Sequence, residues 1–140
     1  MQSKEKNNLI FVRLFPGEEV YECLKEVCKK HEIETAVVLS GIGQLEEIEL
    51  GYLKEKGNYM PQKFEKPHEL LSLSGNISNQ DSKYVFHLHA VFGDEEKKAV
   101  GGHLIKGRVS VTGEIVLLKT NLKIKRKLEE ETGLQGLFLK

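Results

Sequence analysis

The chain has 140 residues, of which 39% are apolar and 30% are charged, as in an ordinary globular protein. No apolar run approaches the roughly 20 residues that a membrane span needs. The 21 basic residues balance 21 acidic ones, so composition argues against both a membrane protein and bulk electrostatic affinity for nucleic acid. We expect a single domain over residues 1–140 that begins with a polar tail, residues 1–8.

The polar tail lacks the apolar stretch of a secretory signal, which favours a cytoplasmic location. Cys23 and Cys28 form no C-x-x-C pair. In a reducing compartment both residues are expected to be free thiols.

The first half of the chain predicts a strand, a helix and a second strand. Residues 9–15 are apolar and β-branched and end at Pro16 and Gly17, which is typical of a strand. Residues 18–31 carry apolar side chains at helical spacing, with acidic residues in the first turn and basic residues in the last. Residues 35–42 are almost continuously apolar, as in a buried central strand. This order suggests a right-handed β-α-β unit.

The rest of the chain predicts short strands separated by Gly, Asn and Asp turns. The candidates are residues 47–53, 62–67, 69–77, 84–92, 107–111 and 113–120. The fold class is therefore α+β: a sheet-rich, mostly antiparallel domain with one main helix. Gly41 and Gly43 follow the apolar strand, but no third glycine or helix follows, so we interpret them as a tight turn and not as a dinucleotide site.

Three histidines form the most informative chemical pattern. In residues 84–92, His87 and His89 share one face of the predicted strand, opposite an apolar face. Two such residues stand about 6.6 Å apart, close enough for their imidazoles to meet on one metal ion. His103 follows two glycines that let the backbone approach the sheet, so it is the candidate third ligand. Three histidines leave one coordination position open, as in reactive zinc sites.

The same histidines also fit a structural role, since neutral imidazoles pack in cores and interfaces with their nitrogens hydrogen-bonded. His31, at a helix end, and His68, at a strand start, are expected to be structural or solvent-facing. Glu114 lies within an otherwise apolar strand. It is a candidate acid/base group or partner of a histidine, or an exposed polar residue on the wet face of the sheet.

One basic cluster is present, comprising Lys123, Lys125, Arg126 and Lys127. Three glutamates follow it at residues 129–131, and their charges balance the cluster locally. We expect a solvated polar segment that contacts nucleic acid weakly at most.

Several segments together resemble the PPC (plant and prokaryote conserved) domain. They are LSGIG at 39–43, ELLSLSGNIS at 69–78, HLH at 87–89, GGHLIKG at 101–107, TGEI at 112–115 and TGL at 132–134. The resemblance implies the α/β fold of that family, a homotrimer, and a metal at His87, His89 and His103. It is closest to the stand-alone prokaryotic type, often described as predicted DNA-binding proteins. The Arg-Gly-Arg-Pro AT-hook of the plant members is absent.

Two functions follow as expectations. The first is a homotrimeric, metal-binding regulatory or interaction module, with zinc as the expected metal and DNA as a weak partner. The alternative is a metal-dependent hydrolase or lyase, in which a histidine-bound metal activates water and Glu114 moves protons.

Overall fold

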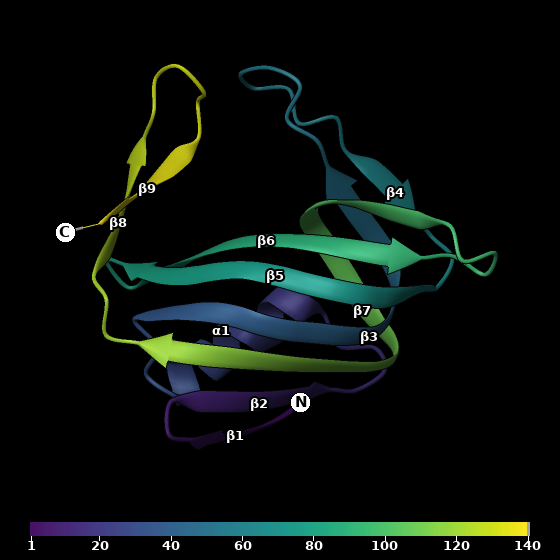
Figure 1. The fold of residues 1–140 in the computed structure, drawn as a ribbon, viewed down its shortest axis with the longest axis horizontal. Coiled ribbons are helices and arrows are strands. Elements are labelled where there is room, and N and C mark those ends of the chain that lie inside the picture. The colour runs from purple at the N-terminus through teal and green to yellow at the C-terminus, as the bar shows by residue number, and fades with distance from the viewer. Residues whose placement is uncertain (140) are drawn as a thin grey trace.

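Antiparallel strands make up most of the chain (Figure 1), and the computed structural model describes residues 1–139. The elements are β1 (Gln2–Lys6), β2 (Leu9–Leu14), α1 (Val20–Lys30), β3 (Thr35–Gly51), β4 (Gln62–Phe64), β5 (His68–Gln80), β6 (Lys83–Gly93), β7 (Ala99–Thr120), β8 (Ile124–Leu128) and β9 (Gln135–Leu139). Within this part of the chain, no helix has the length and apolar character that a membrane span requires.

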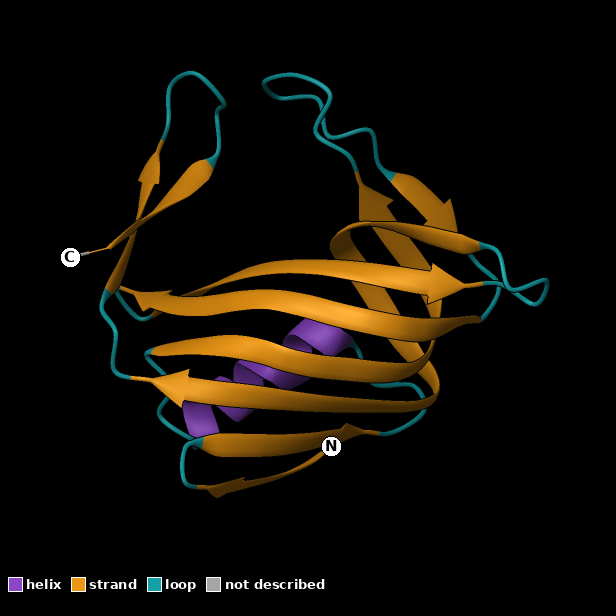
Figure 2. Cartoon of the chain, viewed as in Figure 1, coloured by secondary structure: helices purple, strands orange, loops and turns teal. Residues whose placement is uncertain are grey.

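The helix α1 covers one face of the sheet (Figure 2). It begins after Glu19, whose side chain accepts a hydrogen bond from the Glu22 backbone N–H and so satisfies an open donor of the first turn. Val20, Leu24 and Val27 recur at helical spacing and are buried in the core. Cys23 and Cys28 are free and buried on the same helix, and burial raises their pKa values to about 11 and about 12. The predicted helix is confirmed.

The larger sheet has the order β1-β2-β7-β6-β5-β3-β4, and an additional pairing of β7 with β3 closes β3, β5, β6 and β7 into a ring. All pairings between these strands are antiparallel, as predicted. Because β2 and β3 both run antiparallel to β7, they are parallel to one another with β7 between them. The smaller sheet is the hairpin of β8 and β9.

Two strands are much longer than the sequence pattern indicated. Residues 35–42 and 47–53 belong mainly to the single strand β3, and residues 107–111 and 113–120 to β7. The predicted turn at Gly41 and Gly43 is wrong. A Cβ at Gly41 would lie 2.5 Å from Cβ of Leu73, and one at Gly43 would lie 2.0 Å from the Thr112 carbonyl oxygen. These glycines therefore permit close packing between neighbouring segments.

The N-terminal segment differs from the polar tail that was expected. It contains β1, which pairs with β2 through a turn at Asn7 and Asn8, with φ values of 52° and 66°. Two consecutive residues with positive φ are typical of a type I′ hairpin turn. A second such turn, Asp81 and Ser82, connects β5 and β6.

Candidate metal centre

His87, His89 and His103 come together on the face of the sheet opposite the buried core. His87 and His89 alternate along β6 with Leu88 and Ala90, whose side chains are buried. His103 lies on β7, directly paired with His89. One ring nitrogen of each histidine lies within 4.8 Å of the other two. The strand geometry thus brings together the three residues that the sequence pattern selected.

The three rings form a nearly even triangle. Their centroids are separated by 5.0 Å between His87 and His89, 5.6 Å between His87 and His103, and 5.5 Å between His89 and His103. The Nε2 atoms of His87 and His89 are 3.2 Å apart. Two nitrogens bound to a tetrahedral zinc ion at 2.0–2.1 Å are separated by about 3.3 Å, so this spacing fits shared coordination. It also fits a hydrogen bond between the two imidazoles.

The electrostatics of the cluster favour neutral imidazoles. Burial lowers the pKa of His103, and the neighbouring His87 and His89 lower it further. Burial also lowers the pKa of His87, with smaller effects from His89 and Arg126. Nδ1 of His103 is buried without a hydrogen-bond partner among the described residues. A neutral histidine set with one unpartnered buried nitrogen suits a metal ion, which binds only unprotonated imidazole.

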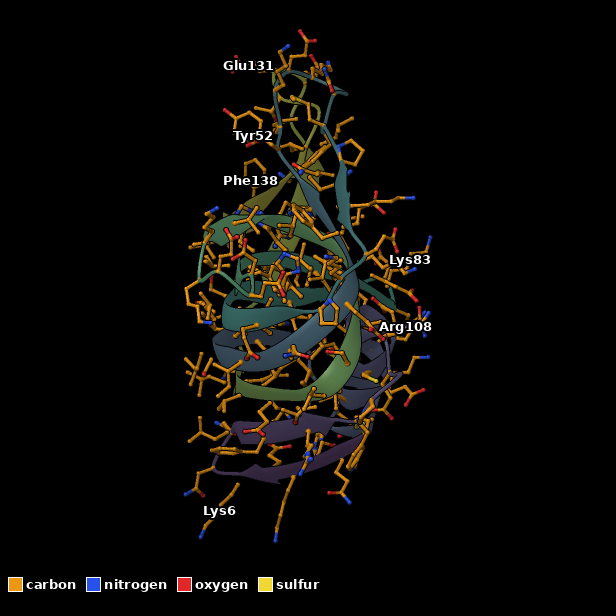
Figure 3. The ribbon with its side chains drawn as sticks, turned by 90° about the vertical axis from the view of Figure 1, so that its right-hand side faces the viewer. Lys6, Tyr52, Lys83, Arg108, Glu131 and Phe138 are labelled. Atoms are coloured by element: carbon orange, nitrogen blue, oxygen red, sulfur yellow. The ribbon has the colours of Figure 1, made fainter. Side chains whose placement is uncertain are left out.

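A cavity of about 320 Å³ adjoins the cluster. His87 and His103 line it, together with Tyr59 from the β3–β4 connection and residues of the β8–β9 hairpin. The ring of Tyr59 lies 5.4 Å from that of His103. The two flanking segments meet where Nζ of Lys56 donates to the Glu130 carbonyl oxygen at 2.5 Å. Figure 3 shows Tyr52 and Glu131, from these two segments, at the same end of the molecule, with Lys6 at the other.

Glu114 is not part of this cluster within one chain. It lies on β7 eleven positions after His103, where it pairs with Ile42 on β3 and Arg13 on β2. Its side chain is exposed and accepts a hydrogen bond from Thr112 Oγ1 at 3.4 Å. The structure therefore places it on the wet face of the sheet, away from the histidines.

The basic cluster is divided by the strand that contains it. Lys123, Lys125 and Lys127 are exposed, whereas Arg126 is only 7% exposed and lines the histidine cavity. A solvated segment was expected, but Lys125, Arg126 and Lys127 lie in the strand β8. Successive side chains alternate between the two sides of a strand, so Arg126 turns inward while its two neighbours face solvent. Arg126 is therefore not part of the exposed basic surface that the three lysines form.

The remaining histidines lie elsewhere. His31 ends α1 and contacts Ser3 and Glu5 on β1, with its Nδ1 3.2 Å from Oε2 of Glu5. His68 begins β5, and its Nδ1 lies 2.9 Å from the Lys66 carbonyl oxygen. Neither residue joins the three-histidine group.

Sequence reasoning missed the walls of the cavity. Asn76, Tyr59 and the β8–β9 hairpin carry no metal-ligand spacing, and only the three-dimensional structure brings them to the histidines. One signal was available for Asn76. It lies in the strand that neighbours the His-x-His strand, and the register pairs it with His87.

Comparison with known families decides the relationship: residues 1–121 match the Plants and Prokaryotes Conserved (PCC) domain, also called PPC. The chain belongs to this family. The PPC resemblance drawn from the motifs is therefore confirmed, and the match covers all three histidines of the cluster.

Solved structures show the same PPC fold. A protein from Bacteroides thetaiotaomicron proposed to bind DNA is 27% identical, with a TM-score of 0.92 over 99% of this chain and 96% of that one. A PPC protein from Pyrococcus horikoshii is 34% identical, with a TM-score of 0.81 over 96% and 93%. A metal-containing protein from Archaeoglobus fulgidus is 30% identical, with a TM-score of 0.84 over 96% and 95%.

Two curated relatives are bifunctional GlmU proteins from Synechococcus strains. They are 28% and 27% identical to this PPC domain over 124 residues, which is 87% of the chain. The chain spans only 18% and 19% of the length of these relatives. The likeness therefore concerns one segment of a much longer protein.

Proposed function

We propose that this PPC protein binds a divalent metal, zinc, through His87, His89 and His103 and acts as a homotrimeric regulatory or interaction module. The observation that carries the proposal is the convergence of three imidazole nitrogens within 4.8 Å. The metal-containing protein from Archaeoglobus fulgidus, 30% identical over nearly the whole chain, supports the same assignment.

The ligand set favours an open centre. His87 and His89 would bind from β6 and His103 from β7, leaving a fourth position toward solvent or the cavity. A zinc ion so bound acts as a Lewis acid and lowers the pKa of a coordinated water to about 7. The residues of the chain keep the imidazoles neutral, orient them by strand pairing and limit access through the adjoining cavity walls.

The trimer is supported by an uncovered apolar surface. Phe11 is 63% exposed, Ile42 is 49% exposed and Leu39 is 52% exposed. Phe11 and Ile42 line one open cleft with Val116. Contiguous exposed apolar side chains mark interaction surfaces in soluble proteins.

DNA is proposed only as a weak partner. The relative from Bacteroides thetaiotaomicron supports the idea, and the three exposed lysines around β8 form a local basic cluster that could contact the phosphate backbone. The net charge of zero and the glutamates at residues 129–131 limit the affinity.

The alternative is a metal-dependent hydrolase or lyase, which the cavity beside the histidines favours. Within one chain Glu114 does not reach this cavity, so an acid/base role for it requires a second subunit. Glu129 and Tyr59 line the cavity and are the groups that one chain itself supplies.

The test is metal analysis of the purified protein after chelator treatment and reloading with zinc. One zinc per chain is the expected result. A protein that takes up no zinc would return the three histidines to a purely structural role. Exchange of a zinc-bound water that titrates near neutrality would favour the enzyme over the module.

A further inference from the structure

Arg126 is a buried cation beside the histidine cluster. Its position on β8 turns it into the cavity, while the neighbouring Lys125 and Lys127 point to solvent. The Arg126 residue is only 7% exposed, whereas arginine is almost never buried without a paired anion.

The partners of Arg126 are all neutral. Nε donates to Ser78 Oγ at 3.4 Å, Nη1 donates to the Gln135 carbonyl oxygen at 3.3 Å, and Nη2 donates to Oδ1 of Asn76. No carboxylate of residues 1–139 lies within ion-pair distance of it. A guanidinium carries five N–H donors, so one N–H on each terminal nitrogen remains without a partner.

The charge of the cavity is also unbalanced. Three neutral imidazoles do not offset a divalent ion, and Arg126 adds a further positive charge. The carboxylate that lines the same cavity belongs to Glu129, which is exposed and accepts a hydrogen bond from Thr132 Oγ1 at 3.4 Å. In a partly buried site of low dielectric, such an excess of positive charge attracts a small anion.

We propose that Arg126 and the metal centre are the two ends of a binding site for a small oxyanion, either a carboxylate or a phosphate. The inference rests on the proposed metal site. The two open N–H groups suit bidentate binding of two oxygens of one anion. A phosphate would have a further oxygen for the metal, whereas one oxygen of a carboxylate would have to serve both Arg126 and the metal. A cavity of about 320 Å³ has the size of a small-molecule site.

The experiment is calorimetric titration with two probes, acetate and inorganic phosphate, of zinc-loaded and metal-free protein. Both forms of the wild type are expected to bind, and the zinc-loaded form more tightly. The preferred probe distinguishes a planar from a tetrahedral ligand. Arg126→Gln is expected to weaken binding about tenfold or more, as for loss of hydrogen bonds to a charged group. Zinc uptake should be unchanged in this variant.

Matched variants separate charge from geometry. Arg126→Lys keeps the positive charge but loses the planar pair of N–H donors, and this variant is expected to bind acetate or phosphate more weakly than the wild type. Lys125→Gln removes a neighbouring exposed charge and should bind as wild type does. Should Arg126→Gln fail to fold, the guanidinium nitrogen signals of Arg126 in the wild-type protein provide the test. They should shift on acetate or phosphate addition, and unmoved signals would overturn the proposal.

The outcomes distinguish the two proposals. The protein takes up zinc in the first case, but anion binding is absent or is unchanged by substitution of Arg126. This result overturns the oxyanion site and leaves the metal centre intact. Absence of zinc uptake overturns the metal centre. In that case the two-ended site is overturned as well, and Arg126-dependent binding to the metal-free protein would show an anion site at Arg126 alone.

Discussion

His89 lies directly opposite His103 across the antiparallel pair of β6 and β7. Directly opposed residues have Cβ atoms about 4.5–5.5 Å apart on the same face of a sheet. His87 stands two positions along β6 on that face. Strand pairing therefore fixes the backbone positions from which all three imidazoles project, and these positions do not lie on a loop.

Replacement of any one of these histidines by alanine is expected to weaken zinc binding to a similar degree. The loss should exceed the roughly tenfold to hundredfold that follows removal of a residue that only orients a ligand. Chelator competition with purified variants measures it. His31→Ala and His68→Ala are the controls and should match wild type, because both lie outside the group. Full zinc affinity in His103→Ala would contradict a three-histidine site.

Zinc affinity is expected to fall in acid. Metal binding requires neutral imidazole, and the pKa values of His87 and His103 lie below the ordinary value of about 6.5, chiefly because of burial. Protons therefore compete only at low pH, and the affinity should be nearly constant from pH 8 to 7 and fall steeply below about pH 6. Chelator competition across this range provides the measurement.

The metal-free protein should show a related effect on stability. Because the folded pKa of His103 is lowered, the unfolded state binds more protons as the pH falls below about 6.5. The free energy of unfolding should therefore decrease between about pH 6.5 and the lowered pKa. His103→Gln should reduce this slope, and an unchanged slope would show that His103 does not cause it.

Gly75→Ala is expected to destabilise the protein by about 2–3 kcal/mol. Gly75 has a φ of +144°, and a Cβ there would lie 1.9 Å from the His87 carbonyl oxygen. Gly17→Ala is a matched control, since Gly17 also has a positive φ, of +88°, but no atom within 4 Å of a Cβ. Its cost should be nearer 1 kcal/mol. Equal losses in denaturant unfolding would show that contact with β6 is unimportant.

The protein is expected to scatter light with three times the 15.9 kDa mass of the chain. Phe11→Lys and Ile42→Lys place charges on the exposed apolar face and should shift the mass toward that of one chain. Lys25→Glu, on the solvent side of α1, should leave it unchanged. A wild-type mass near 15.9 kDa at micromolar concentration rules out the trimer.

Duplex DNA is expected to bind weakly and with strong salt dependence. Neutralising Lys123, Lys125 and Lys127 together should remove most of the binding measured at low salt, because these are the exposed cations of the cluster. Fluorescence anisotropy at several salt concentrations measures the effect. Sub-micromolar affinity at about 0.15 M salt that these changes abolish would show that the lysines are a specific DNA surface.

Much of the fold could be predicted from local patterns. Apolar periodicity identified α1, and strict alternation identified β6 and the face that carries His87 and His89. The Asn7 and Asn8 turn was a usable signal for β1 that polarity obscured. The full lengths of β3 and β7 were not readable, because these strands continue through glycines that local rules assign to turns.

Part of the candidate site could likewise be predicted from the sequence, and part could not. Strand period and a glycine pair brought His103 into consideration, and the structure places it beside the other two histidines. The position of Arg126 could not be predicted, because it depends on how the β8–β9 hairpin packs against β5, where Arg126 meets Ser78 and Asn76. A run of basic residues in the sequence does not indicate which of their side chains points into the protein.

The closed ring of strands also has a kinetic consequence. Thr35 on β3 pairs with Thr120 on β7, and the ring can form only after the chain between them has been brought back on itself. Closing a loop of this length costs entropy before the contacts that offset it exist, so folding should be slow, in the millisecond-to-second range of β-rich domains. All three histidines lie on the β6–β7 hairpin, whose pairing is local in sequence, so zinc added during refolding is expected to bind before the ring has closed.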